Sequence, residues 1–129
     1  MKFKIHDFVN SKGVNEFKTW TLSLQKKEQG KLREKIDKLM LHGDELYPMM
    51  LTDTPIPGIK KIRVQGPVKL RPLLCSGPVA VGQEYTMLLG AKEIGSQWAP
   101  KDAPTTANDK KNEVSQDPVK RRISHERIT

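Results

Sequence analysis

Residues 58–89 read GIKKIRVQGPVKLRPLLCSGPVAVGQEYTMLL, and their pattern gives the strongest indication of the fold. It holds three apolar-rich segments that are separated by Gly-Pro, Ser-Gly-Pro and Gly-Gln, which are typical turn sequences. Basic residues occupy alternate positions of the first two segments: Lys61, Arg63, Lys69 and Arg71. Because strand side chains alternate between faces, we predict a sheet with these cations on one face and aliphatic residues on the other.

The turn between the first two segments predicts their register. A hairpin that keeps both aliphatic sets on one face places Val64 opposite Val68, with residues 65–67 as the loop. Arg63 then lies beside Lys69, and the next two cations also face each other. Each pair of like charges across two strands costs a few tenths of a kcal/mol to about 1. Such a cluster favours an anionic partner, for which phosphate suits Arg and Lys well. A merely solvated basic face is the alternative.

The composition describes one small basic domain. The 129 residues carry a net charge of +8, and aromatic residues make up only 5%, so we expect a mostly aliphatic core. Residues 60–91 hold five basic residues and one acidic residue, which is half of the net charge. This excess argues for an anionic partner. No apolar run approaches the roughly 18 residues of a membrane span and no signal segment opens the chain, so we expect a cytoplasmic protein.

The sequence gives little support for metal or thiol chemistry. The single Cys75 cannot form an internal disulfide, and the three histidines are scattered without zinc-ligand spacing. Cys75 ends an apolar segment, which favours a small buried thiol. We therefore expect neither a metal ion nor another cofactor.

The chain before residue 44 predicts one strand and two helices. Alternation at the start indicates a short strand with Phe3 and Ile5 inward. Apolar residues spaced by three and four predict a helix from Val14 to near Gly30, and a second helix that ends at Gly43. The two helices form an antiparallel hairpin.

The rest of the chain predicts one more strand and one weak helix. Residues 44–57 contain three prolines and form an irregular connector. Residues 84–90 indicate an interior strand, and residues 92–95 lead into a loop. A helix opens at Pro100, and its Pro, Thr, Asn and Asp content makes it weak. The polar tail over residues 115–129 is expected to be flexible.

The order of these elements predicts an α+β domain over residues 1–114, followed by a basic, flexible C-terminal tail over residues 115–129. The domain has a small, antiparallel-rich sheet. The N-terminal helical hairpin packs on one face of that sheet, which leaves the other face for the basic residues.

Five motifs in this order resemble the RelE/HigB superfamily of toxins, in its phage-derived HigB-like branch. They are a helical hairpin ending in Leu39-Met40-Leu41-His42-Gly43, Pro-Gly-Ile-Lys-Lys-Ile-Arg at 57–63, Leu-Arg at 70–71, Leu-Leu-Gly-Ala-Lys at 88–92 and Pro-Lys-Asp-Ala at 100–103. The resemblance covers about residues 1–115. It implies a RelE-like, microbial-RNase-like scaffold that enters the ribosomal A site and cuts mRNA. It also implies an antitoxin partner, often a helix-turn-helix protein, and a cytoplasm that is bacterial, or that of the host if a phage encodes the chain.

The resemblance also implies roles for single residues. The family's strand arginines match Arg63 and Arg71, which would stabilise the phosphorane formed when a ribose 2′-hydroxyl attacks the adjacent phosphate. Lys61 or Lys60 would serve as the base, as would Glu93. The predicted catalytic residues are Arg63, Arg71, Lys61 and Lys92, which matches the family's lysine after the last strand, and the predicted RNA-binding residues are Lys60, Lys69, Glu93, Lys120, Arg121 and Arg122.

Two departures from the family bear on catalysis. Many members end the last strand in Tyr or a Lys/His pair, whereas residues 89–93 offer no Tyr or His, and the nearest candidates are Tyr85 and His125. Pro72 directly follows Arg71 and should remove a ladder hydrogen bond or force a bulge. Two alternatives to a toxin therefore remain. One is a catalytically inactive protein on this scaffold, for instance a phage-encoded inhibitor of a host factor that binds RNA or protein. The other is an unrelated basic nucleic-acid-binding module.

Overall fold

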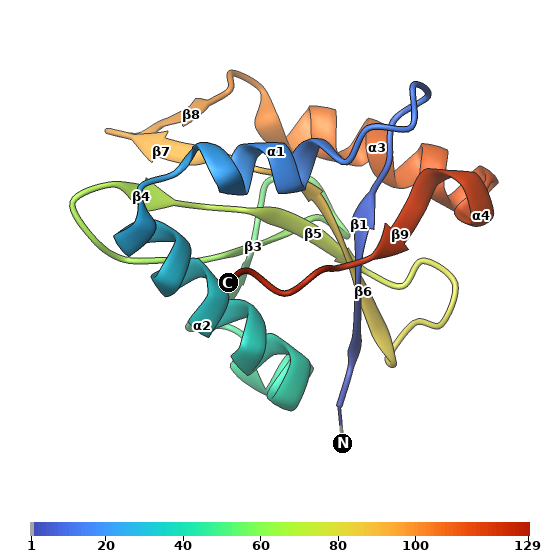
Figure 1. Cartoon of the computed structure of the whole chain (residues 1–129), viewed down its shortest axis with the longest axis horizontal. Coiled ribbons are helices and arrows are strands. Elements are labelled where there is room, and N and C mark those ends of the chain that lie inside the picture. Colours follow the sequence, from blue (N-terminus) through green and yellow to red (C-terminus); the bar gives the residue numbers. More distant parts are fainter. Residues whose placement is uncertain (1) are drawn as a thin grey trace.

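A computed structural model describes residues 2–129 and shows an α+β architecture (Figure 1). The strands of the main sheet lie in the order β2 (Leu51–Asp53), β3 (Lys60–Ile62), β5 (Leu73–Ser76), β6 (Glu84–Leu89), β1 (Lys4–Phe8) and β9 (Arg122–Ser124). β1 and β6 run parallel, and the other neighbouring strands run antiparallel. A second sheet consists of β4 (Lys69–Leu70), β7 (Lys92–Ile94) and β8 (Gln97–Ala99). The predicted α+β class is confirmed.

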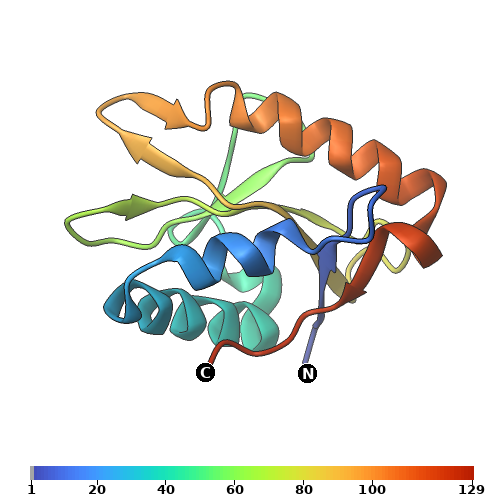
Figure 2. The same cartoon turned by 45° about the horizontal axis from the view of Figure 1, so that its top comes forward.

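Helices α1 (Glu16–Ser23) and α2 (Lys26–His42) form the predicted hairpin and cover one face of the main sheet (Figure 2). The predicted break at Gly30 is wrong, because Gly30 lies inside α2. The carboxylate of Glu28 accepts a hydrogen bond from the backbone N–H of Gln25 at 3.1 Å, which marks the start of the second helix. Gly43 ends α2 as predicted. Its φ is +55°, and a Cβ there would lie 2.3 Å from the ring of Phe3.

Helix α3 (Ala103–Gln116) covers the opposite face of the sheet. The helix predicted after Pro100 is therefore present, and it runs for 14 residues despite its unfavourable composition. Pro104 falls in the first turn, where a missing N–H is harmless. Ala103 and Ala107 are fully buried and let α3 approach the sheet closely. Cys75 is buried beneath them, as predicted, and this burial raises its pKa to about 11.

The first two segments of the central stretch pair two residues away from the predicted register. Val64 bridges Leu70 instead of Val68. Arg63 consequently lies opposite Arg71 and not beside a lysine. The apolar pattern cannot distinguish two registers that differ by two residues, because both keep the aliphatic side chains on the same face.

Pro72 divides the second segment into β4 and β5, and the β5–β6 pairing shifts register between Leu73 and Leu74. This disruption is what a missing backbone N–H predicts. Residues 92–95, which were expected to lead into a loop, instead begin the β7–β8 hairpin, which turns at Gly95 with φ +65°. Together, β4, β7 and β8 form a ribbon that extends beyond the main sheet (Figure 1).

The C-terminal segment is a packed part of the domain, which corrects the expectation of a flexible tail from residue 115. Helix α4 (Pro118–Arg121) follows α3, and β9 pairs with β1. His125 Nδ1 lies 2.9 Å from Asp7 Oδ1, and Ile128 is buried among the side chains of α1 and α2. Because the segment is mostly polar, its sequence did not indicate that Ile128 would be buried. No helix within residues 2–129 is long and apolar enough to span a membrane.

Candidate nucleic-acid interface

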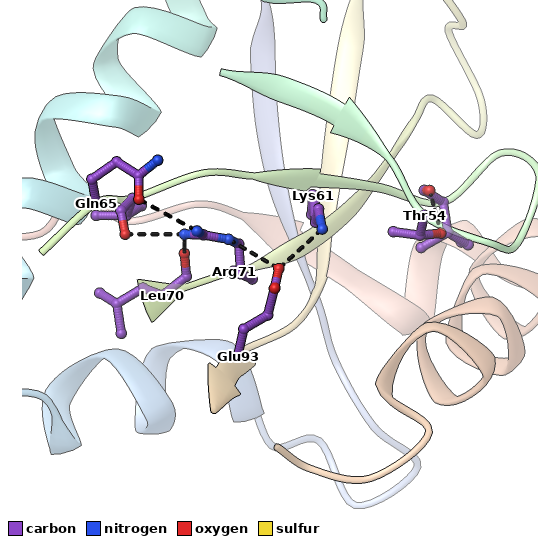
Figure 3. Close-up of polar contacts among 8 residues, drawn as sticks. Thr54, Lys61, Gln65, Leu70, Arg71 and Glu93 are labelled. Atoms are coloured by element: carbon purple, nitrogen blue, oxygen red, sulfur yellow. Dashed lines mark hydrogen bonds and ion pairs between the residues drawn. The ribbon is translucent and has the colours of Figure 1, made fainter. Parts of the chain in front are cut away.

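Arg71 lies buried at the centre of the predicted site, with 3% of its surface exposed. Its Nη1 donates hydrogen bonds to the carbonyl oxygens of Val64 and Leu70, at 3.1 and 2.8 Å, and its Nη2 donates to Oε1 of Gln65 at 3.4 Å (Figure 3). Burial lowers the pKa of Arg71 below its usual value, although the charge of Glu93 opposes this shift. Its donors serve the protein, which corrects the expectation of an arginine that faces solvent.

Glu93 joins Arg71 to Lys61. Its Oε1 accepts hydrogen bonds from Lys61 Nζ at 2.9 Å and from Arg71 Nε at 3.1 Å (Figure 3). Partial burial raises the pKa of Glu93, but the hydrogen bond and charge of Lys61, together with Arg71, outweigh it and lower that pKa below its usual value. Glu93 is therefore an ionised carboxylate at neutral pH, held in one orientation by two cations.

Lys61 has access to solvent beside this carboxylate, since 20% of its side chain is exposed. Its ammonium lies 5.1 Å from the ring centroid of Trp98, which is directly opposite Glu93 in the β7–β8 hairpin. A cation over an indole face is favourable, so Trp98 helps to hold Lys61 toward Glu93. Sequence reasoning missed Trp98 because it did not predict this hairpin.

Arg63 and Lys69 are exposed cations on the same face as this cluster. Among residues 2–129, no carboxylate lies within 4.0 Å of either side chain. Lys92 pairs with Leu70 and therefore leaves β7 on the face opposite Glu93. It nevertheless lines a shallow groove together with Lys69 and Glu93 at the edge of the ribbon.

The structure separates Lys60 from this cluster. Lys60 Nζ lies 2.7 Å from Asp53 Oδ1 and 4.4 Å from the ring centroid of Tyr47. Successive strand residues point to opposite faces, so Lys60 points away from the face that Lys61 occupies. The expectation that both lysines face one ligand is therefore corrected.

The predicted RNA-binding residues of the C-terminal segment also lie elsewhere. Lys120 and Arg121 belong to α4, and Arg122 is hydrogen bonded to Glu84. β9 is an edge strand of the main sheet, and β5, β6 and β1 lie between it and β3. These three cations therefore do not join the Lys61 cluster.

Tyr85 and His125, the two candidates for the missing Tyr or His, are engaged in other contacts. The hydroxyl of Tyr85 donates to Asp44, and burial raises its pKa. His125 pairs with the buried Asp7, whose other oxygen accepts a hydrogen bond from Asn15 Nδ2 at 2.9 Å. Within the part of the chain that the structure describes, no three His, Cys, Asp or Glu residues are grouped so as to hold a metal ion.

The cluster combines an ionised carboxylate, an adjacent ammonium and two exposed cations, Arg63 and Lys69, that have no acidic partner among residues 2–129. A carboxylate and an ammonium at 2.9 Å can accept and donate protons on one substrate, and unpaired Arg and Lys attract phosphate. Comparison of the chain with protein-family models, characterised proteins and solved structures gave no match.

Proposed function

We propose that this protein binds RNA at the face that carries Lys61 and Glu93 and cleaves it there. In the fuller form implied by the family resemblance, the RNA is mRNA in the ribosomal A site, and an antitoxin of the helix-turn-helix class restrains the activity. One observation carries the proposal. The ion pair of Lys61 with Glu93 is partly open to solvent, and it is bordered by Arg63 and Lys69, for which no acidic partner is found within residues 2–129.

The proposed reaction is attack of a ribose 2′-oxygen on the neighbouring phosphorus. The Glu93 carboxylate takes the proton of the 2′-hydroxyl while the new P–O bond forms. The bond from phosphorus to the 5′-oxygen breaks, and the Lys61 ammonium supplies a proton to that oxygen. The products are a 2′,3′-cyclic phosphate and a 5′-hydroxyl end. Arg63 would offset the charge of the phosphorane, whereas Arg71 acts only by positioning Glu93.

Binding without cleavage is the second candidate, and a specific observation favours it. The donors of Arg71 are used within the protein, so the cluster has one fewer cation for a phosphorane than the resemblance implied. Tyr85 and His125, which would be alternative acids or bases, lie outside the cluster. A protein of this kind would bind its RNA without cutting it.

Purified protein added to ribosomes that translate a defined mRNA separates the two candidates. If the protein is an endonuclease, 5′ ends appear within codons, and Glu93→Gln or Lys61→Met lowers the rate of cutting by about 10²- to 10⁴-fold. The neighbouring Lys60→Met is the matched control and should cut like the wild type, since Lys60 points away. Circular dichroism melts confirm that each variant is folded.

Three outcomes are possible in this assay. Cutting that depends on Lys61 and Glu93 supports the endonuclease. Intact mRNA with slowed translation and measurable RNA binding supports the second candidate. Intact mRNA without RNA binding overturns both.

A further inference from the structure

The first of two neighbouring grooves lies between the start of α2 and the loop of the β3–β4 hairpin. Lys27, Lys31 and Glu28 line it from the helix, and the Glu28 carboxylate accepts the hydrogen bond from the backbone N–H of Gln25. Lys31 Nζ lies 3.5 Å from the carbonyl oxygen of Gln65, and a Cβ at Gly66 would lie 2.8 Å from that same ammonium. The Lys31 ammonium therefore rests against the loop backbone, and Lys27 lies one turn earlier on the same side of the helix.

The second groove lies where the start of β4 pairs with the end of β7, and Lys69, Lys92 and Glu93 line it. Pro67 and Val68 line both grooves, so the two meet at the tip of the hairpin loop. Because Glu93 also holds Lys61, the second groove leads directly to the proposed reaction site.

The lysines of these grooves are available to an anion. In the part of the chain that the structure describes, Lys27, Lys31 and Lys92 have no carboxylate within 4.0 Å. Val68, which lines both grooves, is an apolar residue with 39% of its surface exposed. The hairpin tip, the β7–β8 hairpin and the start of α2 project at the same end of the molecule in both views (Figures 1 and 2). Cations on both sides of an exposed apolar contact suit a chain that carries both phosphates and bases.

We propose that the two grooves form one track for single-stranded RNA, which leads from Lys61 and Glu93 over Val68 to Lys31 and Lys27. This inference rests on the proposed function, because the track would hold the nucleotides that flank the reacting phosphate. The lysines contact phosphates, and Val68 packs against a base. An unpaired strand can turn over one loop, whereas a double helix is too stiff to do so.

The test compares RNA lengths in one double variant, Lys27→Glu/Lys31→Glu. Labelled 2′-O-methyl RNA cannot be cut through its 2′-oxygen, so fluorescence anisotropy reports binding alone. We expect a 12-nucleotide RNA to lose at least tenfold in affinity, with a salt slope that is smaller by about 1 to 2 phosphates. A 4-nucleotide RNA, which fits at Lys61 without reaching α2, should bind as it does to the wild type.

The matched control is Lys2→Glu/Lys12→Glu, which changes the net charge equally. Both lysines are exposed, and they flank β1, which β5 and β6 separate from β3. Loss confined to the long RNA and to the α2 variant supports the track. Wild-type affinity of the α2 variant for the long RNA, or an equal loss in the control, overturns the track and leaves the proposed function standing. Failure of the wild type to bind either RNA overturns both.

Discussion

Arg71 Nε lies 3.1 Å from Glu93 Oε1, and this ion pair joins the loop of the β3–β4 hairpin to the β7–β8 hairpin. Arg71 is almost fully buried, while Glu93 keeps 23% of its side chain exposed. The pair therefore has an inner cation that supports the structure and an outer carboxylate that a ligand can reach. It makes the geometry of the proposed site depend on the packing of the hairpin.

Replacement of Arg71 by alanine should destabilise the fold by about 3 kcal/mol, because it removes the side-chain donor to two buried carbonyl oxygens and one of the two cations that hold Glu93. Urea unfolding followed by circular dichroism measures the change. Arg63→Ala is the control. Arg63 is exposed and lies opposite Arg71, so its loss should change the free energy of unfolding by less than about 0.5 kcal/mol. Equal effects of the two variants would show that Arg71 has no structural role.

The ion pairs of Glu93 should make stability depend on pH. The pKa of Glu93 in the folded chain lies below its ordinary value of 4.5, so the carboxylate stabilises the fold fully above pH 4.5. That contribution declines as the pH falls from 4.5 through the lower pKa of the folded state. Urea unfolding of the wild type and of Glu93→Gln should therefore differ most near pH 7, and the difference should shrink as the pH falls below 4.5. A difference that stays constant over this range would contradict the assignment.

Gly30 offers a stabilising substitution, because it lies inside α2 and not at a helix end. A Cβ at Gly30 would meet no atom closer than 4.0 Å, so Gly30→Ala should raise the free energy of unfolding by about 0.5 to 1 kcal/mol. Gly90→Ala is the contrast, since a Cβ there would lie 2.0 Å from the ring of Trp20. Thermal melts should move upward for the first variant and downward for the second. Destabilisation by Gly30→Ala would contradict a continuous α2.

The C-terminal segment should contribute to stability through Ile128, which is 8% exposed and packs in the core beneath α1 and α2. Ile128→Ala should cost about 2 kcal/mol. Ile123→Ala makes the same chemical change at a side chain that is 54% exposed, and it should be nearly neutral. Urea unfolding compares the two. If Ile128→Ala were also neutral, the segment would be detached in solution.

Much of the fold follows from local patterns in the sequence. The alternation of Ile62 and Val64 with charged residues predicts the sheet face on which the helical hairpin α1–α2 packs. The glycine at position 43 predicts the end of the second helix. The predictions that were wrong concern segments whose structure depends on tertiary contacts. The polar C-terminal segment is ordered by Ile128 and by the pair of His125 with Asp7, and neither contact has a local signal.

The site was predicted less well than the fold, because alternation tells which face a residue occupies but not what covers it. Arg71 and Arg63 share a face, yet one is buried by its own hairpin and the other is exposed. Glu93 was predicted at the site, but its contacts depend on the β7–β8 hairpin, which the sequence did not indicate. A register that differs by two residues was enough to exchange the neighbours of these cations.

The most direct measurement of the central claim is a nuclear magnetic resonance titration of ¹⁵N-labelled protein with a single-stranded 2′-O-methyl RNA. If RNA binds at the proposed site, amide signals of Lys61, Arg63 and Glu93 shift together at one affinity, and those of β9 and α4 stay in place. Shifts confined to α4 and β9, or no shifts at millimolar RNA, would contradict an RNA site at this face.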